Sequence, residues 1–236
     1  MHLHAVILLS GGMDSATTAA VGRAEGFDLF PIAFNYGQRH QVEITAARRV
    51  CAHLGLREPV IIPIDLRAFG NSALTADIAV PKDRDITGSS DLIPITYVPA
   101  RNTIFLSYAL AYAEVVKAFT LFIGANAMDF SGYPDCRPDY LVAFQTMANL
   151  ATRAGREHPG ALRIRAPLVE MTKAQIVRKG IELGVDFSLT TSCYDPDQMG
   201  HACARCDACQ LRLKGFLEAG IADPIQYSAT RHDRVT

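Results

Sequence analysis

The chain has 236 residues, of which 49% are hydrophobic, and its formal net charge is −1 at pH 7. This length and composition can form one large core, or one core with a small appendage, and they exclude a disordered protein. The apolar runs are interrupted by Gly, Pro or charged residues well before 18 residues, which excludes a membrane-spanning helix. The nearly neutral charge argues against a broad nucleic-acid surface, so we expect small-molecule partners and no direct contact with nucleic acid or membrane.

The first residues, M-H-L-H-A, lack the basic segment of a signal peptide, and the apolar residues after them lead directly into a glycine-containing loop. We therefore expect a cytoplasmic protein. In that compartment the six cysteines stay mostly reduced, so a cluster of four near the C-terminus indicates a metal site and not disulfides.

Apolar runs of strand length alternate with helical patterns through the first half of the chain. Strands are expected at residues 5–9, 28–35, 59–64 and 121–125, and helices at residues 16–25, 42–54 and 103–117. Gly26 and Gly55 stand where the first two helices would end. This alternation predicts an α/β fold, a Rossmann-like parallel sheet with helices on both faces. In such a sheet ligands bind outside the carboxyl ends of the strands.

The first expected strand continues into the sequence L-S-G-G-M-D-S at residues 9–15. The two glycines let the backbone turn sharply and approach an anion, while Ser10, Ser15 and the first amides of the next helix supply donors. The Walker and dinucleotide-binding glycine patterns are absent, which excludes a kinase-type P-loop. Asp14 would repel a phosphate unless it caps the helix or helps to hold Mg²⁺, and either role suits a loop that binds Mg²⁺ and ATP.

The string S-G-G-x-D-S resembles the PP-loop of ATP pyrophosphatases, which cleave ATP between its α and β phosphates and attach AMP to a substrate oxygen. The resemblance therefore implies AMP transfer in place of phosphoryl transfer. The expected ATP-binding residues belong to the loop and the start of the helix: Leu9, Ser10, Gly11, Gly12, Met13, Asp14, Ser15, Ala16, Thr17, Thr18 and Ala19.

Residues 66–92 form a long, mostly polar connection with weak periodicity, including the charged stretch K-D-R-D and the turn-forming G-S-S. Long loops of this kind are usually functional or mobile. The sequence leaves two alternatives open, a lid over the nucleotide and a variable surface insertion.

Residues 124–140 follow the strand expected at 121–125 and carry many groups that could hold a flat polar ligand. Phe130 and Tyr133 could stack on a heteroaromatic ring. Asp129 or Asp135 could accept hydrogen bonds from a guanine-like edge, and Arg137 could pair with a carboxylate. The alternative is an ordinary loop punctuated by Gly and Pro.

Four cysteines, Cys193, Cys203, Cys206 and Cys209, have the spacing C-x9-C-x2-C-x2-C. The closely spaced trio can wrap one tetrahedral ion while Cys193 completes the site, and four thiolates with no open position favour structural zinc. An iron–sulfur cluster, or His201 in place of one cysteine, remains an alternative. An amphipathic helix is expected at residues 207–217. Cys51 is expected to be a buried small residue, and Cys136 is left without an assigned role.

Six motifs, in order along nearly the whole chain, resemble the 7-cyano-7-deazaguanine synthase family of the queuosine pathway. They are S-G-G-M-D-S at 10–15, Y-G-Q-R-H at 36–40, P-A-R-N at 99–102, S-G-Y-P-D-C-R-P at 131–138, T-S-C-Y at 191–194 and C-A-R-C-D-A-C at 203–209. Several of them, in particular the fourth, are not shared by PP-loop enzymes at large. The resemblance implies an adenine nucleotide alpha hydrolase-like domain at residues 1–186 and a small zinc-binding region with a polar tail at residues 187–236.

The resemblance also implies a ligase that uses ATP and ammonia to convert 7-carboxy-7-deazaguanine into 7-cyano-7-deazaguanine. The carboxylate oxygen would attack the α-phosphorus of ATP, and ammonia would displace AMP from the acyl adenylate to give an amide. The amide oxygen would then be activated in turn and leave as AMP. Mg²⁺ should accompany ATP. No glutaminase triad is visible on the chain, so free ammonium is the expected nitrogen source.

The expected catalytic residues are Asp14, Arg101 and Lys173. Arg101, in P-A-R-N, and Lys173, at the start of a helix expected at 173–183, would place positive charge on the departing pyrophosphate. The alternative is solvated surface charge, although Lys173 lies at the unfavourable end of the helix dipole. The residues expected to hold a substrate after the second strand are Tyr36, Gln38, Arg39 and His40.

Two other functions are compatible with parts of this pattern. One is a PP-loop enzyme that modifies tRNA, for which a stronger basic stripe or an added RNA-binding domain would be expected. The other is an adaptor that joins an ATP-binding fold to a zinc module. An apolar C-terminal helix braced by zinc could also supply the interface of a homodimer.

Overall fold

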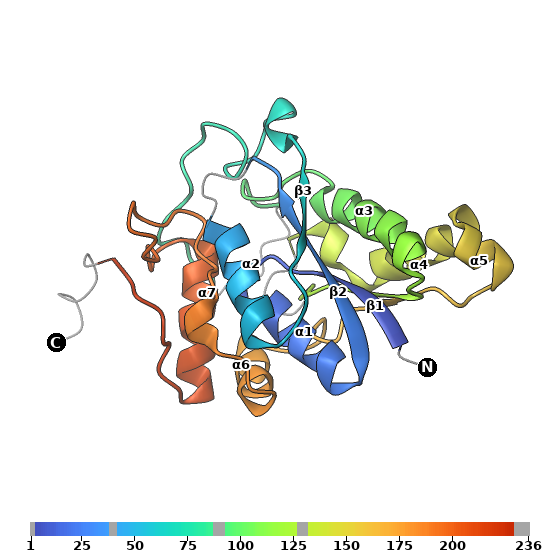
Figure 1. The fold of residues 1–236 in the computed structure, drawn as a ribbon. Helices are drawn as coiled ribbons and strands as arrows, with labels where there is room; N and C mark the ends of the chain where they lie inside the picture. Colours follow the sequence, from blue (N-terminus) through green and yellow to red (C-terminus); the bar gives the residue numbers. More distant parts are fainter. Residues whose placement is uncertain (1–2, 38–41, 87–92, 127–131, 229–236) are drawn as a thin grey trace.

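The computed structural model describes residues 3–37, 42–86, 93–126 and 132–228 (Figure 1). Its centre is a five-stranded parallel sheet with the strand order β3-β2-β1-β4-β5. The strands are β1 (Leu3–Leu8), β2 (Phe27–Asn35), β3 (Val60–Pro63), β4 (Thr120–Phe122) and β5 (Arg163–Arg165). The prediction of a Rossmann-like parallel sheet is therefore confirmed.

Helices cover both faces of this sheet (Figure 1). They are α1 (Met13–Ala24), α2 (Val42–His53), α3 (Arg101–Val116), α4 (Pro138–Ala151), α5 (Arg153–Glu157), α6 (Lys173–Glu182) and α7 (Asp207–Ala219). The described ranges also contain the short 3-10 helices η1 (Leu66–Ala68), η2 (Pro134–Cys136) and η3 (Phe187–Leu189). Among the described residues, no helix combines the length and the apolar character that a membrane crossing requires.

The central strand β1 divides the core because successive side chains point to opposite faces of a sheet. Ala5 and Ile7 pack into the layer formed with α1, α2, α6 and α7. Val6 and Leu8 pack into the other layer, formed with α3 and α4. Since β1 is buried on both sides, it appears in the sequence as an uninterrupted apolar run.

In the second half, the strand expected at 121–125 and the helices expected at 173–183 and 207–217 correspond to β4, α6 and α7, whereas α4, α5 and β5 were not predicted. Helix α4 begins with Pro138 at its first position, where proline is tolerated, yet the residues before it predicted only a loop. Strand β5 is three residues long and contains two arginines, so it lacks an apolar pattern. Helix α1 begins at Met13, three residues before the predicted start, because the glycine loop turns directly into it.

The connection at residues 66–92 is described up to residue 86, and this part lies against the cysteine-rich segment. Ala73 and Val80 are buried in one apolar cluster with the four cysteines. Lys82 Nζ lies 2.7 Å from Asp195 Oδ2. The described part of the connection thus braces the cysteine-rich segment, and none of residues 66–86 lines the pocket described below.

A buried arginine fastens the C-terminal part of the chain to the rest. The Arg212 side chain on α7 is 1% exposed and pairs with Asp223 through its Nε and Nη2 atoms, at 2.8 and 2.9 Å. Arg212 also donates to Thr190 Oγ1 at 2.8 Å and to the Phe187 carbonyl at 3.0 Å. Tyr227 donates to the same Asp223 carboxylate. Every polar atom of the guanidinium network therefore has a partner, as a buried charge requires.

Candidate active site

A cavity of about 290 Å³ lies at the carboxyl edge of the sheet, beside the ends of β1 and β4. Strand β1 pairs with β2 on one side and β4 on the other, so the chain leaves the sheet in different directions at this edge. Such a crossover point is where open α/β sheets bind ligands. Residues 8–10 and 12–15 line the cavity on the β1 side, and residues 123–126 line it on the β4 side.

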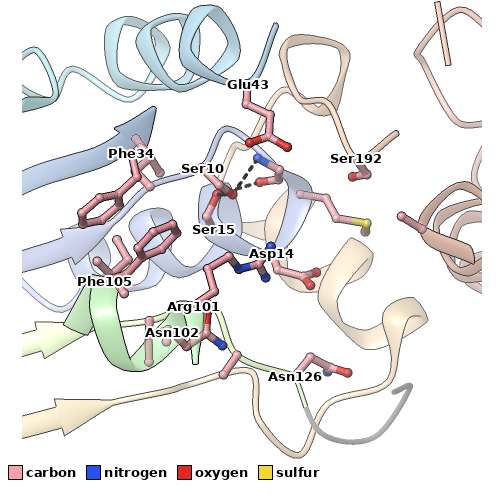
Figure 2. A pocket seen from close by; sticks show the side chains of 18 of the residues that line it. Ser10, Asp14, Ser15, Phe34, Glu43, Arg101, Asn102, Phe105, Asn126 and Ser192 are labelled. Carbon is pink, nitrogen blue, oxygen red and sulfur yellow. Dashed lines mark hydrogen bonds between the residues drawn. The ribbon is translucent and has the colours of Figure 1, made fainter. Parts of the chain in front are cut away.

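The loop after β1 is held by short-range hydrogen bonds (Figure 2). Ser10 Oγ and Ser15 Oγ lie 3.1 Å apart, the Gly12 amide donates to Ser10 Oγ at 3.3 Å, and Ser15 Oγ donates to the Gly12 carbonyl at 3.0 Å. Gly11 has a φ of +79°, and a Cβ atom there would lie 2.5 Å from the Ala47 amide nitrogen on α2. Only glycine permits both this conformation and this close approach.

Asp14 and Lys173 form an ion pair at the cavity wall. Lys173 Nζ donates to Asp14 Oδ2 at 2.7 Å, and the two side chains are 13% and 26% exposed. Of the two roles considered for Asp14, a helix cap and a Mg²⁺ ligand, the first is wrong, because Gly12 occupies the cap position and Asp14 lies within the first turn. The second oxygen, Oδ1, is buried without a hydrogen-bond partner among the described residues. Asp14 therefore has one acceptor atom left for a ligand.

Arg101 is the second cation at the cavity and is the first residue of α3. The residue before it, Ala100, adopts the left-handed conformation with φ +53°, which is strained for a residue other than glycine. Figure 2 shows the guanidinium turned toward the side where Asp14 lies. Burial lowers the pKa of Arg101, whereas charge interactions with Tyr36, Tyr133, Tyr194 and Cys136 raise it, and the net pKa is above its usual value, so the charge persists.

Glu43, in the first turn of α2, also lines the cavity, and the sequence analysis missed it. Burial raises the pKa of Glu43 to about 7 from its ordinary value of 4.5, and the positive charge of Arg101 acts in the opposite direction. In Figure 2 its carboxylate lies over the loop that contains Ser10. The only signal in the sequence was its position in the helix that follows β2, since that helix begins at the carboxyl edge of the sheet.

The predicted substrate residues divide into three groups. Tyr36 and Tyr133 line the cavity. Asp135 and Arg137 are outside its lining: Asp135 accepts from the Asn102 amide at 2.9 Å, and Arg137 pairs with Asp139 on the surface at 2.9 Å. Residues outside the described part of the chain are Gln38, Arg39, His40, Asp129 and Phe130.

The predicted nucleotide residues beyond the first turn of α1 lie inside the protein. Thr17 and Thr18 donate to the carbonyls of Met13 and Asp14, both at 2.9 Å, and neither side chain lines the cavity. Ala16 and Ala19 are buried in the core. The structure thus brings residues 9–15 of the predicted set to the cavity, with Gly11 turned toward α2.

Cys136 is buried and lines the cavity, where Asn102 Nδ2 donates to its Sγ atom at 3.1 Å. Burial raises the pKa of the Cys136 thiol to about 11. The side chain is therefore a neutral thiol near pH 7 and is a poor nucleophile. Cys51 is on α2 and is buried in the core, as predicted.

The four predicted metal-binding cysteines, Cys193, Cys203, Cys206 and Cys209, lie together. Their Sγ atoms are all within 4.8 Å of one another, and all four residues are buried. The amides of Asp195 and Cys203 donate to the Cys193 sulfur at 3.3 and 3.2 Å, and the Cys206 amide donates to the Cys203 sulfur at 3.3 Å. His201 is outside this group and pairs with Asp197. This arrangement can hold one metal ion.

The cysteine-rich segment also contributes to the cavity wall, which the sequence did not indicate. We refer to residues 190–211 as the cysteine arm. Its residues that line the cavity are Thr191, Ser192, Tyr194, Asp207, Ala208 and Leu211. The side chains of Tyr194 and Tyr133 form a hydrogen bond, and burial raises the pKa of Tyr194 well above its usual value. The cysteine cluster is therefore next to the site, and the segment that carries it forms part of the cavity wall.

Comparisons with known proteins identify the family. The family described as queuosine biosynthesis protein QueC matches residues 4–220. A relative from Kineococcus radiotolerans is 61% identical over 94% of this chain and 97% of its own length, and one from Geobacter sulfurreducens is 60% identical over 94% and 92%. Both relatives are named 7-cyano-7-deazaguanine synthase.

A solved structure from Methanocaldococcus jannaschii, described as a predicted subunit of tRNA methyltransferase, has a similar fold. It is 14% identical, with a TM-score of 0.50 over 94% of this chain and 90% of that chain. At this identity the likeness concerns the fold alone. The family match and the two relatives, each covering nearly the whole chain, show that the chain belongs to the QueC family of queuosine biosynthesis proteins.

Proposed function

We propose that this protein uses ATP and ammonia to convert 7-carboxy-7-deazaguanine into 7-cyano-7-deazaguanine in the cytoplasm. The observation that carries this proposal is the QueC family match over residues 4–220, in a chain whose S-G-G-M-D-S loop lines the cavity. The carboxylate is a poor electrophile, so its oxygen must first be converted into a leaving group. AMP transfer does this without a redox step.

The reaction consumes two molecules of ATP. In the first activation a carboxylate oxygen bonds to the α-phosphorus and pyrophosphate leaves; ammonia then adds to the acyl carbon, loses a proton, and displaces AMP. In the second activation the amide oxygen bonds to a new α-phosphorus and pyrophosphate leaves again. The C–O bond then breaks, AMP departs with the oxygen, and the nitrogen loses its remaining protons to form the nitrile.

The residues around the loop are suited to the nucleotide in this reaction. The amide groups at the start of α1 and the hydroxyls of Ser10 and Ser15 can donate to phosphate oxygens. Arg101 and Lys173 line the same cavity and can stabilise the negative charge of departing pyrophosphate. The Lys173 ammonium group would either leave Asp14 and contact the phosphates, or contact Asp14 and the phosphates at the same time.

Mg²⁺ is the metal that we propose for the nucleotide. The residue that fits it is Asp14, whose buried Oδ1 atom has no partner among the described residues. Mg²⁺ prefers oxygen ligands and usually takes one or two carboxylates together with phosphate oxygens and water. When bound, it would neutralise phosphate charge beside the loop.

Zinc is the metal that we propose for the cysteine arm. Four buried thiols whose sulfurs all lie within 4.8 Å match the donor set of a structural zinc site. The amides that donate to Cys193 and Cys203 would stabilise their thiolates. Zinc would hold the two ends of the arm in place. An iron–sulfur cluster would give the purified protein visible absorbance, which zinc lacks.

The test is to incubate the metal-loaded protein with Mg²⁺, ATP, ammonium and 7-carboxy-7-deazaguanine, and to measure the purine and the adenine nucleotide by mass spectrometry. We expect the nitrile and two AMP per nitrile formed. An unchanged purine without AMP would contradict the proposal. AMP that forms only when tRNA is supplied would favour a tRNA-modifying PP-loop enzyme, and ATP binding without turnover of either substrate would favour an adaptor.

A further inference from the structure

Asp207 is a buried carboxylate to which the proposed reaction assigns no role. The residue is 3% exposed and lines the cavity. Neither of its side-chain oxygens has a hydrogen-bond partner among the described residues. A buried carboxylate without hydrogen bonds lowers the stability of the folded protein. Such a group therefore calls for an explanation, and a common one is that a ligand supplies the missing hydrogen bonds.

The fold fixes Asp207 at this position in two ways. It is the first residue of α7 and lies between two of the clustered cysteines, Cys206 and Cys209. The positive end of the helix favours a carboxylate there. Arg84, from the connection that braces the arm, approaches with its Nη1 atom 3.4 Å from Asp207 Oδ2. This distance gives charge attraction and leaves both carboxylate oxygens free to accept hydrogen bonds.

The other described carboxylates near the cavity have other contacts, and the Oδ1 atom of Asp14, which has no partner among the described residues, is the one proposed to bind Mg²⁺. Asp14 pairs with Lys173, and Asp135 accepts the Asn102 amide. Glu43 lies beside the nucleotide loop and is influenced by Arg101. Asp207 therefore has a separate place on the wall of the same cavity, on the cysteine arm.

The chemistry of a carboxylate limits what Asp207 can bind. An ionised carboxylate only accepts hydrogen bonds and repels phosphates and other carboxylates. Its two oxygens match a ligand with two adjacent N–H donors, which the N1–H and 2-amino groups of a guanine-like ring present. Adenine offers an acceptor at N1 beside its amino group, so it does not match both oxygens.

We propose that Asp207 binds the N1–H and 2-amino edge of the 7-deazaguanine ring and makes the cysteine arm part of substrate recognition. This inference rests on the proposed function and names the residue that selects the purine. The metal cluster then has a functional consequence, since it sets the position of the acceptor. The sequence analysis had assigned this role to Asp129 or Asp135.

The experiment compares two substrates on each protein: 7-carboxy-7-deazaguanine and the analogue that lacks the 2-amino group. Wild type should prefer the first in kcat/KM by about 10- to 100-fold, as expected for a hydrogen bond to a charged acceptor. In Asp207→Asn this preference should fall to within about threefold, while ATP-dependent turnover of the analogue changes little. The ratio is measured on one preparation, so it does not depend on the folded fraction.

Two further variants make the result specific. Asp207→Ser also removes the carboxylate and keeps a polar residue in the first turn of α7, so it serves if the amide disturbs the arm. Asp28→Asn is the matched control, because Asp28 pairs with Arg57 away from the cysteine arm and lies outside the cavity lining. The control should retain the wild-type preference, and metal content is measured for all variants.

A preference that is unchanged in both Asp207 variants with full metal content would overturn the inference. A raised KM for ammonium with unchanged purine preference would also overturn it and assign Asp207 to the nitrogen source. Neither result would affect the proposed function, because wild-type protein would still form the nitrile. If wild-type protein forms no nitrile, the proposed function itself fails.

Discussion

The nucleotide loop and the cysteine arm line the same cavity, but they are held in place by different kinds of interaction. Within the loop at residues 10–15, the hydrogen bonds of Ser10, Gly12 and Ser15 join residues at most five apart. The loop has long-range contacts as well, from Lys173 to Asp14 and from the Thr191 amide to the Gly11 carbonyl. The arm is fixed by partners far along the chain, including the contact between Arg205 and Asp83, which are 122 residues apart. The difference teaches that a motif can specify a local site, while the opposite wall of the site depends on the whole fold.

The largest effect is expected for Arg212→Met, which removes the buried hydrogen bonds that hold the cysteine arm. The substitution leaves the Asp223 carboxylate, whose side chain is 4% exposed, buried without its charge partner. Removing one partner of a buried pair costs about 3–5 kcal/mol. Thermal unfolding should shift down by roughly 6–20 °C for a domain of this size.

The control for this prediction is the double variant with Asp223→Asn, which also removes the orphaned charge. It should recover part of the lost stability, since a neutral buried pair costs less than a single buried charge. ATP binding by Arg212→Met at low temperature should stay close to that of wild type, because the loop has its own hydrogen bonds. A variant that unfolds at the wild-type temperature would show that this network does not hold the arm.

The second largest effect is expected for Arg101→Ala, at the part of the cavity proposed to bind the nucleotide. We expect kcat/KM for the deazaguanine acid to fall by about 10²- to 10³-fold, as is typical when one charge-stabilising donor is removed. The metal content of the variant should not change, since Arg101 is outside the cysteine cluster. Steady-state kinetics and metal analysis measure the two quantities separately.

Arg48→Ala is the matched control for Arg101→Ala. Arg48 lies on α2, and its exposed side chain pairs with the exposed Glu58. It should change kcat/KM by less than about twofold. A loss of the same size in both variants would mean that Arg101 contributes only to general stability, and its assignment to pyrophosphate would be wrong.

Glu43 gives a smaller effect that depends on pH. Its pKa is raised by burial from 4.5 to about 7 in the folded protein, so the folded state holds a proton that the unfolded state has released. Stability from this group is therefore lost as the pH rises from about 4.5 to about 7, by at most about 3 kcal/mol. Glu43→Gln should flatten the dependence of the unfolding temperature on pH across this window.

The same melts on Glu58→Gln provide the control, because the Glu58 side chain is 75% exposed. Its dependence on pH should follow that of wild type. If Glu43→Gln shows the full wild-type slope, Glu43 is ionised at pH 5 in the folded protein and its burial is compensated by a neighbour.

The sequence predicted what local patterns determine. The parallel sheet, the glycine loop and the four clustered cysteines each depend on neighbouring residues or on short spacings. Lys173 was predicted as a cation for the site, but its contact with Asp14, 159 residues away, depends on how α6 packs beside α1. Of the two roles that the sequence left open for Asp14, the helix cap was wrong for a local reason, since Gly12 occupies the cap position before Met13.

The residues that the sequence did not reveal are those whose role arises from three-dimensional packing. Asp207 lies inside the C-A-R-C-D-A-C motif, where the cysteines explain the pattern and leave the carboxylate without a signal. Glu43 is one acidic residue in the first turn of a helix, which is a common surface arrangement. Only the strand order and the positions of α2 and α7 bring both carboxylates to the same cavity.

The smallest expected effect is that of Arg137→Ala, and it sharpens the comparison within the segment at residues 124–140. Arg137 pairs with Asp139 on the surface, with side chains 59% and 66% exposed, and it is outside the cavity lining, whereas Tyr133 lines the cavity. An exposed pair contributes about 0–1 kcal/mol. Arg137→Ala should therefore leave KM for the deazaguanine acid within about twofold of wild type, while Tyr133→Phe should raise it, because the hydroxyl of Tyr133 is bonded to Thr96. A tenfold rise in KM for Arg137→Ala alone would restore the sequence-based role of this arginine, since its side chain would then have to leave Asp139 when the substrate carboxylate binds.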